Sequence, residues 1–169
     1  MFDACVLGVD PGMAKVGLAV VRGHDRTAEL VWAGTVTTAA DVPDAGRLRL
    51  VAAAVRAAIA EHRPAAVSIE RVAWNRNQVS ALQVARATGA VMVVAAEAGL
   101  PVEEYGPNEV KIAVTGAGNA GKREVQSALV RLHGLRGVPS QPDAADAVAV
   151  ALTHLVGARM RALSRVGAR

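Results

Sequence analysis

The 169-residue chain is poor in cysteine and in aromatic residues. Cys5 is the only cysteine, which excludes an internal disulfide and a zinc site built from several cysteines. No stretch reaches the roughly 18 uncharged apolar residues that a membrane-spanning helix needs. Asp3 stands where a signal peptide would carry basic residues. We therefore expect a soluble, cytoplasmic protein with no membrane partner.

The length and the 52% of hydrophobic residues predict one folded domain with a substantial core. We place this domain at residues 1–160 and a basic C-terminal tail at 161–169. The net charge of +4 and the pI near 10.0 favour an anionic partner. The tail either contacts phosphates or is an ordinary solvated chain end.

Apolar runs and turn residues predict the order of strands and helices along the chain. Strands at 4–10, 15–22 and 28–37 have short connections and should form an antiparallel meander. A helix at 44–62 precedes a strand at 65–70, which should lie parallel to an earlier strand. The remaining elements are a helix at 78–98, a strand at 100–105, and helices near 107–114, 121–133 and 142–160. The sequence thus predicts an α/β fold, a mixed five-stranded sheet flanked by helices on both faces.

Two carboxylates end apolar strands. Asp10 follows VLGV and begins Asp-Pro-Gly, a common turn tripeptide; Glu70 ends AAVSIE. Removing a carboxylate from water at the end of a buried strand costs free energy unless the group has a partner. If the two strands are adjacent and parallel, both side chains emerge at the edge of the sheet where α/β proteins bind ligands. Asp10 is then either a turn residue or a metal ligand.

A second acidic pair, Asp143 and Asp146, lies near the start of the last helix, on one face. The helix dipole favours acids there without any ligand. The alanines between and after them would let this helix approach the sheet and bring four carboxylates together. Their repulsion would be relieved by hard divalent cations, and oxygen-only ligands select magnesium or manganese over zinc. Two such ions, roughly 3.5–4 Å apart, stabilise the attacking and leaving oxygens of a phosphodiester displacement.

Four segments in order, GVDPG at 8–12, SIERV at 68–72, YGPNEVKIAVTGAGNAGKREVQ at 105–126 and DAADAVAVALTH at 143–154, resemble the RuvC family. This family comprises bacterial Holliday-junction resolvases of the RNase H-like superfamily, and the resemblance covers essentially the whole chain. It implies a metal-dependent, structure-selective endonuclease that acts in homologous recombination and DNA repair. The enzyme would be a homodimer that makes paired symmetric nicks in two strands of like polarity at a four-way junction. A RuvA–RuvB branch-migration complex is a further partner implied by the family.

The resemblance also assigns residues. It makes Asp10, Glu70, Asp143 and Asp146 catalytic ligands of two Mg²⁺ ions per site, which Mn²⁺ should replace. It places Lys111 and Lys122 beside the scissile phosphate. Taken without the family, each lysine would be an ordinary solvated side chain.

DNA contacts are expected around the site. The residues concerned are Arg71, Trp74, Arg76, Lys111, Lys122 and Arg123. RuvC proteins often carry a stacking Phe three residues after the strand-ending Glu, but this chain has Ala73 there and Trp74 next. Trp74 either stacks on bases or packs under its loop.

Small residues form a stripe on the helix at 78–98. The stripe either lets the same helix of a second protomer approach closely in a dimer or faces the protein core. The stripe comprises Ala81, Leu82, Ala85, Gly89, Val93 and Ala96. Among the histidines, His154 should be structural, whereas His24, His62 and His133 should be surface residues.

Two alternative functions remain open. One is another nuclease of the same fold that cuts RNA–DNA hybrids or flaps. The other is a junction-binding protein without catalysis, against which the presence of all four acids argues.

Overall fold

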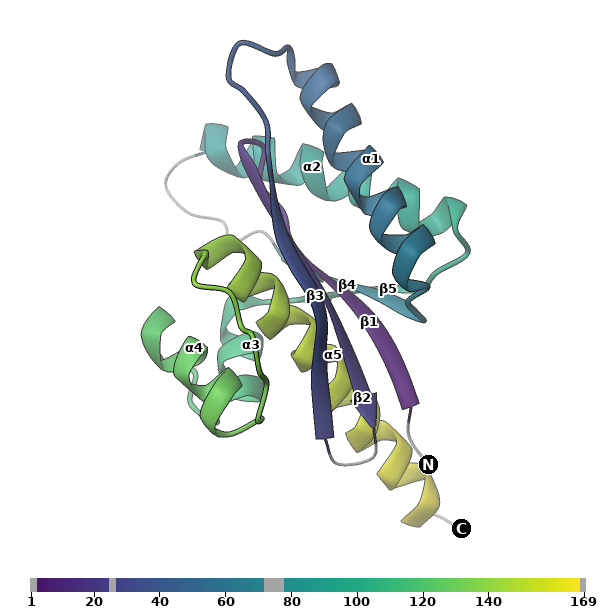
Figure 1. Ribbon diagram of the computed structural model, residues 1–169, viewed down its shortest axis with the longest axis vertical. Coiled ribbons are helices and arrows are strands. Elements are labelled where there is room, and N and C mark those ends of the chain that lie inside the picture. The colour runs from purple at the N-terminus through teal and green to yellow at the C-terminus, as the bar shows by residue number, and fades with distance from the viewer. Residues whose placement is uncertain (1–2, 25–26, 72–77, 168–169) are drawn as a thin grey trace.

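The computed structural model describes residues 3–24, 27–71 and 78–167, with side chains described as far as residue 160 except that of Gln78. Figure 1 shows a twisted sheet with α1 and α2 on one face and α3, α4 and α5 on the other. The strands are β1 (Asp3–Asp10), β2 (Lys15–His24), β3 (Thr27–Thr37), β4 (Ala66–Glu70) and β5 (Val102–Tyr105). The helices are α1 (Asp44–His62), α2 (Gln78–Glu97), α3 (Pro107–Thr115), α4 (Lys122–Arg131) and α5 (Pro142–Gly167).

The sheet has the strand order β3-β2-β1-β4-β5. β1, β2 and β3 pair antiparallel, while β4 pairs parallel with β1 and β5 parallel with β4. The predicted meander and parallel return strands are therefore confirmed. β1 and β4, whose last residues are Asp10 and Glu70, are neighbours at the centre of the sheet.

Each face of the sheet has its own aliphatic core. Leu7, Val9 and Ile69 point to the side covered by α1 and α2. Val6 and Ala19 point to the other side, where α5 packs with α3 and α4. Side chains alternate between the faces of a strand, so Asp10 and Glu70 emerge on the α5 side.

α5 lies unusually close to the sheet because small residues line the contact. Ala144, Ala147 and Ala151 are fully buried. A Cβ atom at Gly8 would overlap the carbonyl oxygen of Ala147, and one at Gly17 would overlap that of Asp143. The close approach expected from the alanines is thus confirmed, and two glycines of the sheet make it possible.

α2 is, among the described helices, the one that is long and apolar enough to cross a membrane by length and composition. Its buried residues Val91 and Ala95 pack against the sheet core, as in a core helix. Arg86 on the same helix forms an ion pair of 2.8 Å with Asp44 of α1. α2 therefore has the contacts of a sheet-covering helix.

Three local expectations differ from the structure. α5 runs to Gly167 rather than ending near 160, because residues 161–166 contain neither proline nor glycine. The His62 side chain is 12% exposed and stacks on Trp32 with ring centroids 5.5 Å apart. His133 is part-buried, with Nε2 2.8 Å from the carbonyl oxygen of Val114. Neither histidine is the surface residue expected, because segments distant in sequence cover them.

Candidate active site

Asp10 and Glu70 leave the sheet side by side. Val9 pairs with Ile69 in the parallel β1–β4 ladder, so the next residue on each strand is a carboxylate on the α5 face. A side-chain hydrogen bond links the two groups. The first turns of α5 add Asp143 and Asp146, whose charges both act on Asp10. The structure thus brings together all four acids that the sequence singled out.

Burial and neighbouring charges change the protonation of Asp10 and Glu70. Burial, followed by the charges of Glu70 and Asp146, raises the pKa of Asp10 to about 8. Burial also raises the pKa of Glu70, against the opposing effect of its hydrogen bond with Asp10. A proton shared by Asp10 and Glu70 therefore offsets part of the repulsion at neutral pH.

A cavity of about 310 Å³, here called the acidic cleft, opens beside this cluster. Its lining includes Glu70, Lys111, Lys122 and Asp146. Lys122 Nζ lies 2.8 Å from Asp146 Oδ2, and this hydrogen bond raises the pKa of the ammonium. Lys111 and Lys122 both act electrostatically on Glu70. The two lysines that the family resemblance places beside a scissile phosphate thus face the carboxylates.

The two lysines are positioned by two helix starts of the same design. α3 begins at Pro107, and the N–H of Gly106 donates to Glu109 Oε2 over 2.6 Å. α4 begins at Lys122, and the N–H of Gly121 donates to Glu124 Oε2, also over 2.6 Å. Pro107 and Lys122 both line the acidic cleft. The positive ends of two helix dipoles therefore meet at a cavity that suits an anion.

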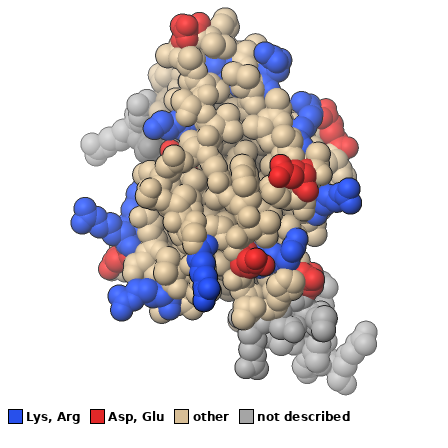
Figure 2. Space-filling view, in the orientation of Figure 1, with Lys and Arg blue, Asp and Glu red and all other residues tan. Residues whose placement is uncertain are grey.

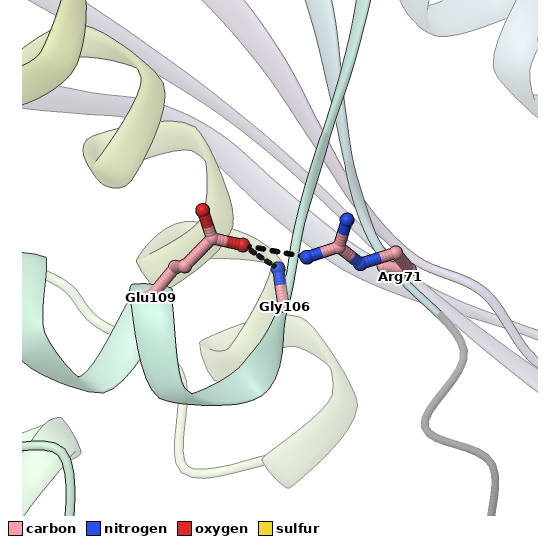
Figure 3. A network of polar contacts seen from close by, with 3 residues as sticks. All are labelled: Arg71, Gly106 and Glu109. Atoms are coloured by element: carbon pink, nitrogen blue, oxygen red, sulfur yellow. Dashed lines mark hydrogen bonds and ion pairs between the residues drawn. The ribbon is translucent and has the colours of Figure 1, made fainter.

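Arg71, for which the sequence predicted a DNA contact, forms an ion pair in the structure. Its guanidinium donates to Glu109 Oε2 over 2.8 Å, so one carboxylate oxygen serves both Arg71 and the start of α3 (Figure 3). More than half of each side chain is exposed. Arg71 is thus tied to α3 yet open to solvent, and Arg123 is exposed on α4. Trp74 and Arg76 lie outside the described residues.

A buried arginine that sequence reasoning missed braces the turn after Asp10. Arg47 of α1 is 8% exposed, and its Nε donates to Thr38 Oγ1 over 2.9 Å. The Thr38 hydroxyl donates to the carbonyl oxygen of Met13 over 2.5 Å, and the Thr38 N–H to that of Ala14. This series of hydrogen bonds holds the β1–β2 turn against α1. An arginine on an amphipathic helix gave no signal of such burial.

The donor set of the cluster suits a hard divalent cation, because it consists of carboxylate oxygens alone. In the part of the chain that the structure describes, no three Asp, Glu, His or Cys side chains are already arranged to hold an ion. The shared proton on Asp10 and the ammonium of Lys122 supply the compensating charge. A bound metal ion would balance the negative charge of the carboxylates in place of the proton and the ammonium, once the carboxylates turned toward it.

The strand order, the helices on both faces and the carboxylates at the central strand ends define a protein of the RNase H-like fold class. The family model described as crossover junction endodeoxyribonuclease RuvC matches residues 6–154. The chain belongs to the RuvC family.

Relatives that carry the same family name are similar in sequence over nearly the whole chain. A crossover junction endodeoxyribonuclease RuvC of Syntrophomonas wolfei is 39% identical over 92% of this chain and 90% of its own length. The protein of that name from Frankia alni is 46% identical over 89% of this chain and 77% of its own length.

Solved structures of Holliday junction resolvases have a similar fold. RuvC of T. thermophilus in complex with a Holliday junction substrate superposes with a TM-score of 0.87 and 39% identity, covering 93% of this chain and 96% of that one. The yeast mitochondrial Holliday junction resolvase Ydc2, at 12% identity and a TM-score of 0.69, shares the fold.

Proposed function

We propose that this protein is a metal-dependent endonuclease that resolves Holliday junctions by paired, symmetric nicks. The observation that carries the proposal is the cluster of Asp10, Glu70, Asp143 and Asp146. Two members of this cluster, Glu70 and Asp146, line a cleft together with Lys111 and Lys122. The family name, crossover junction endodeoxyribonuclease, and a relative bound to a Holliday junction support this substrate. Homologous recombination and DNA repair, in the cytoplasm, are the setting that this activity implies.

The four carboxylates would hold the metal, which we expect to be two Mg²⁺ ions, with Mn²⁺ as a substitute. Metal ions at such a site supply an activated water and stabilise charge on the reacting phosphate. Asp10 must lose its proton to become a ligand, because a ligating carboxylate is ionised. Asp146 must exchange the ammonium of Lys122 for the metal. Lys122 is then free to turn its charge toward the phosphate.

The chain's own groups would bind and orient the scissile phosphate. The N-termini of α3 and α4 and the ammonium groups of Lys111 and Lys122 face the acidic cleft. These groups attract the phosphodiester and oppose the negative charge that develops on it during attack. We also propose DNA contacts from Arg71 and Arg123, and we keep Trp74 and Arg76 as predicted contacts.

A dimer would give two such sites for the two strands of a symmetric junction. Leu82 and Val93 of α2 are 54% and 57% exposed, and Ala85, Gly89 and Ala96 are exposed with them. A Cβ atom at Gly89 would meet nothing within 4 Å. Ala81, which the sequence placed on the same stripe, is buried in the protein's own core. We propose the exposed stripe as the homodimer face; for RuvA–RuvB as partner, the family resemblance is the support.

The test is a substrate panel. A mobile four-way junction, a linear duplex, a flap and an RNA–DNA hybrid are incubated with Mg²⁺, Mn²⁺ or EDTA. We expect metal-dependent paired nicks on the junction alone, abolished by Asp143→Asn with binding retained. Asp41→Asn, at an exposed position of the β3–α1 connection, is the matched control. Preferred cutting of the hybrid or flap would favour the second nuclease function, and tight binding without cutting would indicate a binding protein.

A further inference from the structure

A second and larger cavity, here called the α4 groove, lies beside the acidic cleft. It has a volume of about 730 Å³. Its lining includes Thr115 and Asn119, at the end of α3 and in the next loop, and Arg123, Ser127 and Arg131 of α4. Figure 2 shows Lys and Arg side chains gathered at the lower left of the molecule, over α4. The groove is therefore a basic feature of the surface.

The polar side chains of α4 in the groove form a straight row. Arg123, Ser127 and Arg131 are four residues apart, so they lie on one side of the helix. Each step of four residues advances about 6 Å along the axis. The row offers two guanidinium groups with a hydroxyl between them, which is an arrangement suited to a chain of anions rather than to one ion.

The positive charge of the row exceeds the negative charge in the groove. In the described part of the chain, neither Arg123 nor Arg131 takes part in an ion pair, whereas Arg56, Arg71 and Arg86 each do. Glu124, whose Oε2 accepts the N–H of Gly121 at the helix start, is the one acidic residue among the described residues of the groove lining and balances one of the two arginine charges. A net positive charge therefore remains along the groove.

The groove continues the acidic cleft. Ala120 lines both cavities. Arg123, at the near end of the groove, directly follows Lys122, whose ammonium contacts Asp146 in the cleft. A DNA strand whose scissile phosphate lay in the cleft could leave along α4.

We propose that the α4 groove binds the phosphodiester backbone of the junction arm that leaves the cleft. This inference rests on the proposed function. Arg123 and Arg131 neutralise phosphates, and Ser127 and Asn119 donate hydrogen bonds to phosphate oxygens. Contacts of this kind set the register of the arm without reading its sequence.

The experiment measures junction affinity of the full-length protein against salt concentration, in EDTA so that no cutting occurs. Each phosphate contact adds about 0.9 to the slope of log K against log salt on duplex DNA. We expect Arg131→Gln to lower the slope by about one and the double variant Arg123→Gln/Arg131→Gln by about two. Arg131→Lys, which keeps the charge, should retain the slope. Arg49→Gln, an exposed arginine on the opposite face of the sheet, is the control.

Arm length provides the second measurement. Trimming the junction arms step by step should weaken wild-type binding at the length where an arm no longer reaches the groove, while the double variant stays insensitive to that step. The inference would be overturned, and the proposed function left intact, if Arg131→Gln and the double variant had the same salt-dependence slope as Arg49→Gln. That outcome is also expected if the groove serves an acidic protein segment. Failure of wild type to bind any junction would overturn both.

Discussion

Gly17 of β2 lies against the backbone of Asp143 on α5, so closely that a Cβ atom at Gly17 would overlap the Asp143 carbonyl oxygen. Gly17 pairs with Asp10 across the β1–β2 ladder. The missing side chain therefore lets the acidic turn of α5 come down next to the acidic end of β1. This contact joins the two halves of the carboxylate cluster.

Substituting Gly17→Ala should separate these halves. The added methyl group meets backbone atoms, which cannot turn aside as a side chain can, so we expect a loss of about 1–3 kcal/mol in the free energy of unfolding. Junction cutting should fall by more than the population of folded protein does. Thermal denaturation and single-turnover cutting measure the two effects. Gly118→Ala, whose Cβ would meet the Ile112 side chain at an ordinary 3.5 Å, is the stability control; equal behaviour of the two variants would contradict the account.

The raised pKa of Asp10 makes metal-free stability depend on pH. The folded protein keeps the Asp10 proton up to about pH 8, whereas the unfolded chain loses it near 3.8. The folded state therefore binds more protons between these values, and the free energy of unfolding should fall as pH rises from about 4 to 8. The slope is at most about 1.4 kcal/mol per pH unit for one group.

Denaturant unfolding in EDTA at pH 5, 6, 7 and 8 measures this dependence. Asp10→Asn should flatten it, and Asp41→Asn should not. Since metal binding requires the ionised carboxylate, the midpoint for Mn²⁺ should also move to lower concentration as pH rises. A stability that rises from pH 5 to 8 in both the wild type and Asp10→Asn would refute the shared proton.

Arg47 should matter more for cutting than for folding. Arg47 has a hydroxyl partner and no ion pair among the described residues, so Arg47→Met leaves no buried counter-charge unpaired and should fold. Without the Arg47–Thr38 hydrogen bond, the turn after Asp10 loses its brace, and we expect a roughly 10-fold lower cutting rate at saturating junction. Thr38→Val, which removes the next link to Met13, should act in the same direction and non-additively with Arg47→Met. Wild-type cutting by a well-folded Arg47→Met variant would reduce Arg47 to a packing residue.

The exposed face of α2 should control oligomeric state. Val93→Glu puts a charge into the proposed helix–helix contact and should shift the protein toward monomers in sedimentation experiments. Val130→Glu, at an exposed position of similar size on α4, should leave the distribution unchanged. A Val93→Glu protein as dimeric as the wild type would place the dimer face elsewhere.

The sequence predicted the parts of this protein that depend on local pattern. Asp10 and Glu70 stand out because each ends an apolar strand, and parallel pairing of those strands brings them together. Contacts between distant segments gave no local signal: Glu109 binds Arg71 across 38 residues, and Trp32 covers His62. Arg47 was missed for the same reason, since its burial depends on Thr38 and on the turn after β1. The ion pair of Lys122 with Asp146 likewise requires α4 and α5 to be placed first.

The most direct test of the central claim is single-turnover cutting of a mobile four-way junction with each strand labelled separately. Wild type, Asp146→Asn and Asp41→Asn are compared, with junction affinity measured in parallel. We predict that wild type and Asp41→Asn nick two strands of like polarity at symmetric positions. Asp146→Asn should bind the junction while cutting it more than about 100-fold more slowly. Near-wild-type cutting by Asp146→Asn, or unpaired nicks scattered over all four strands, would contradict the account.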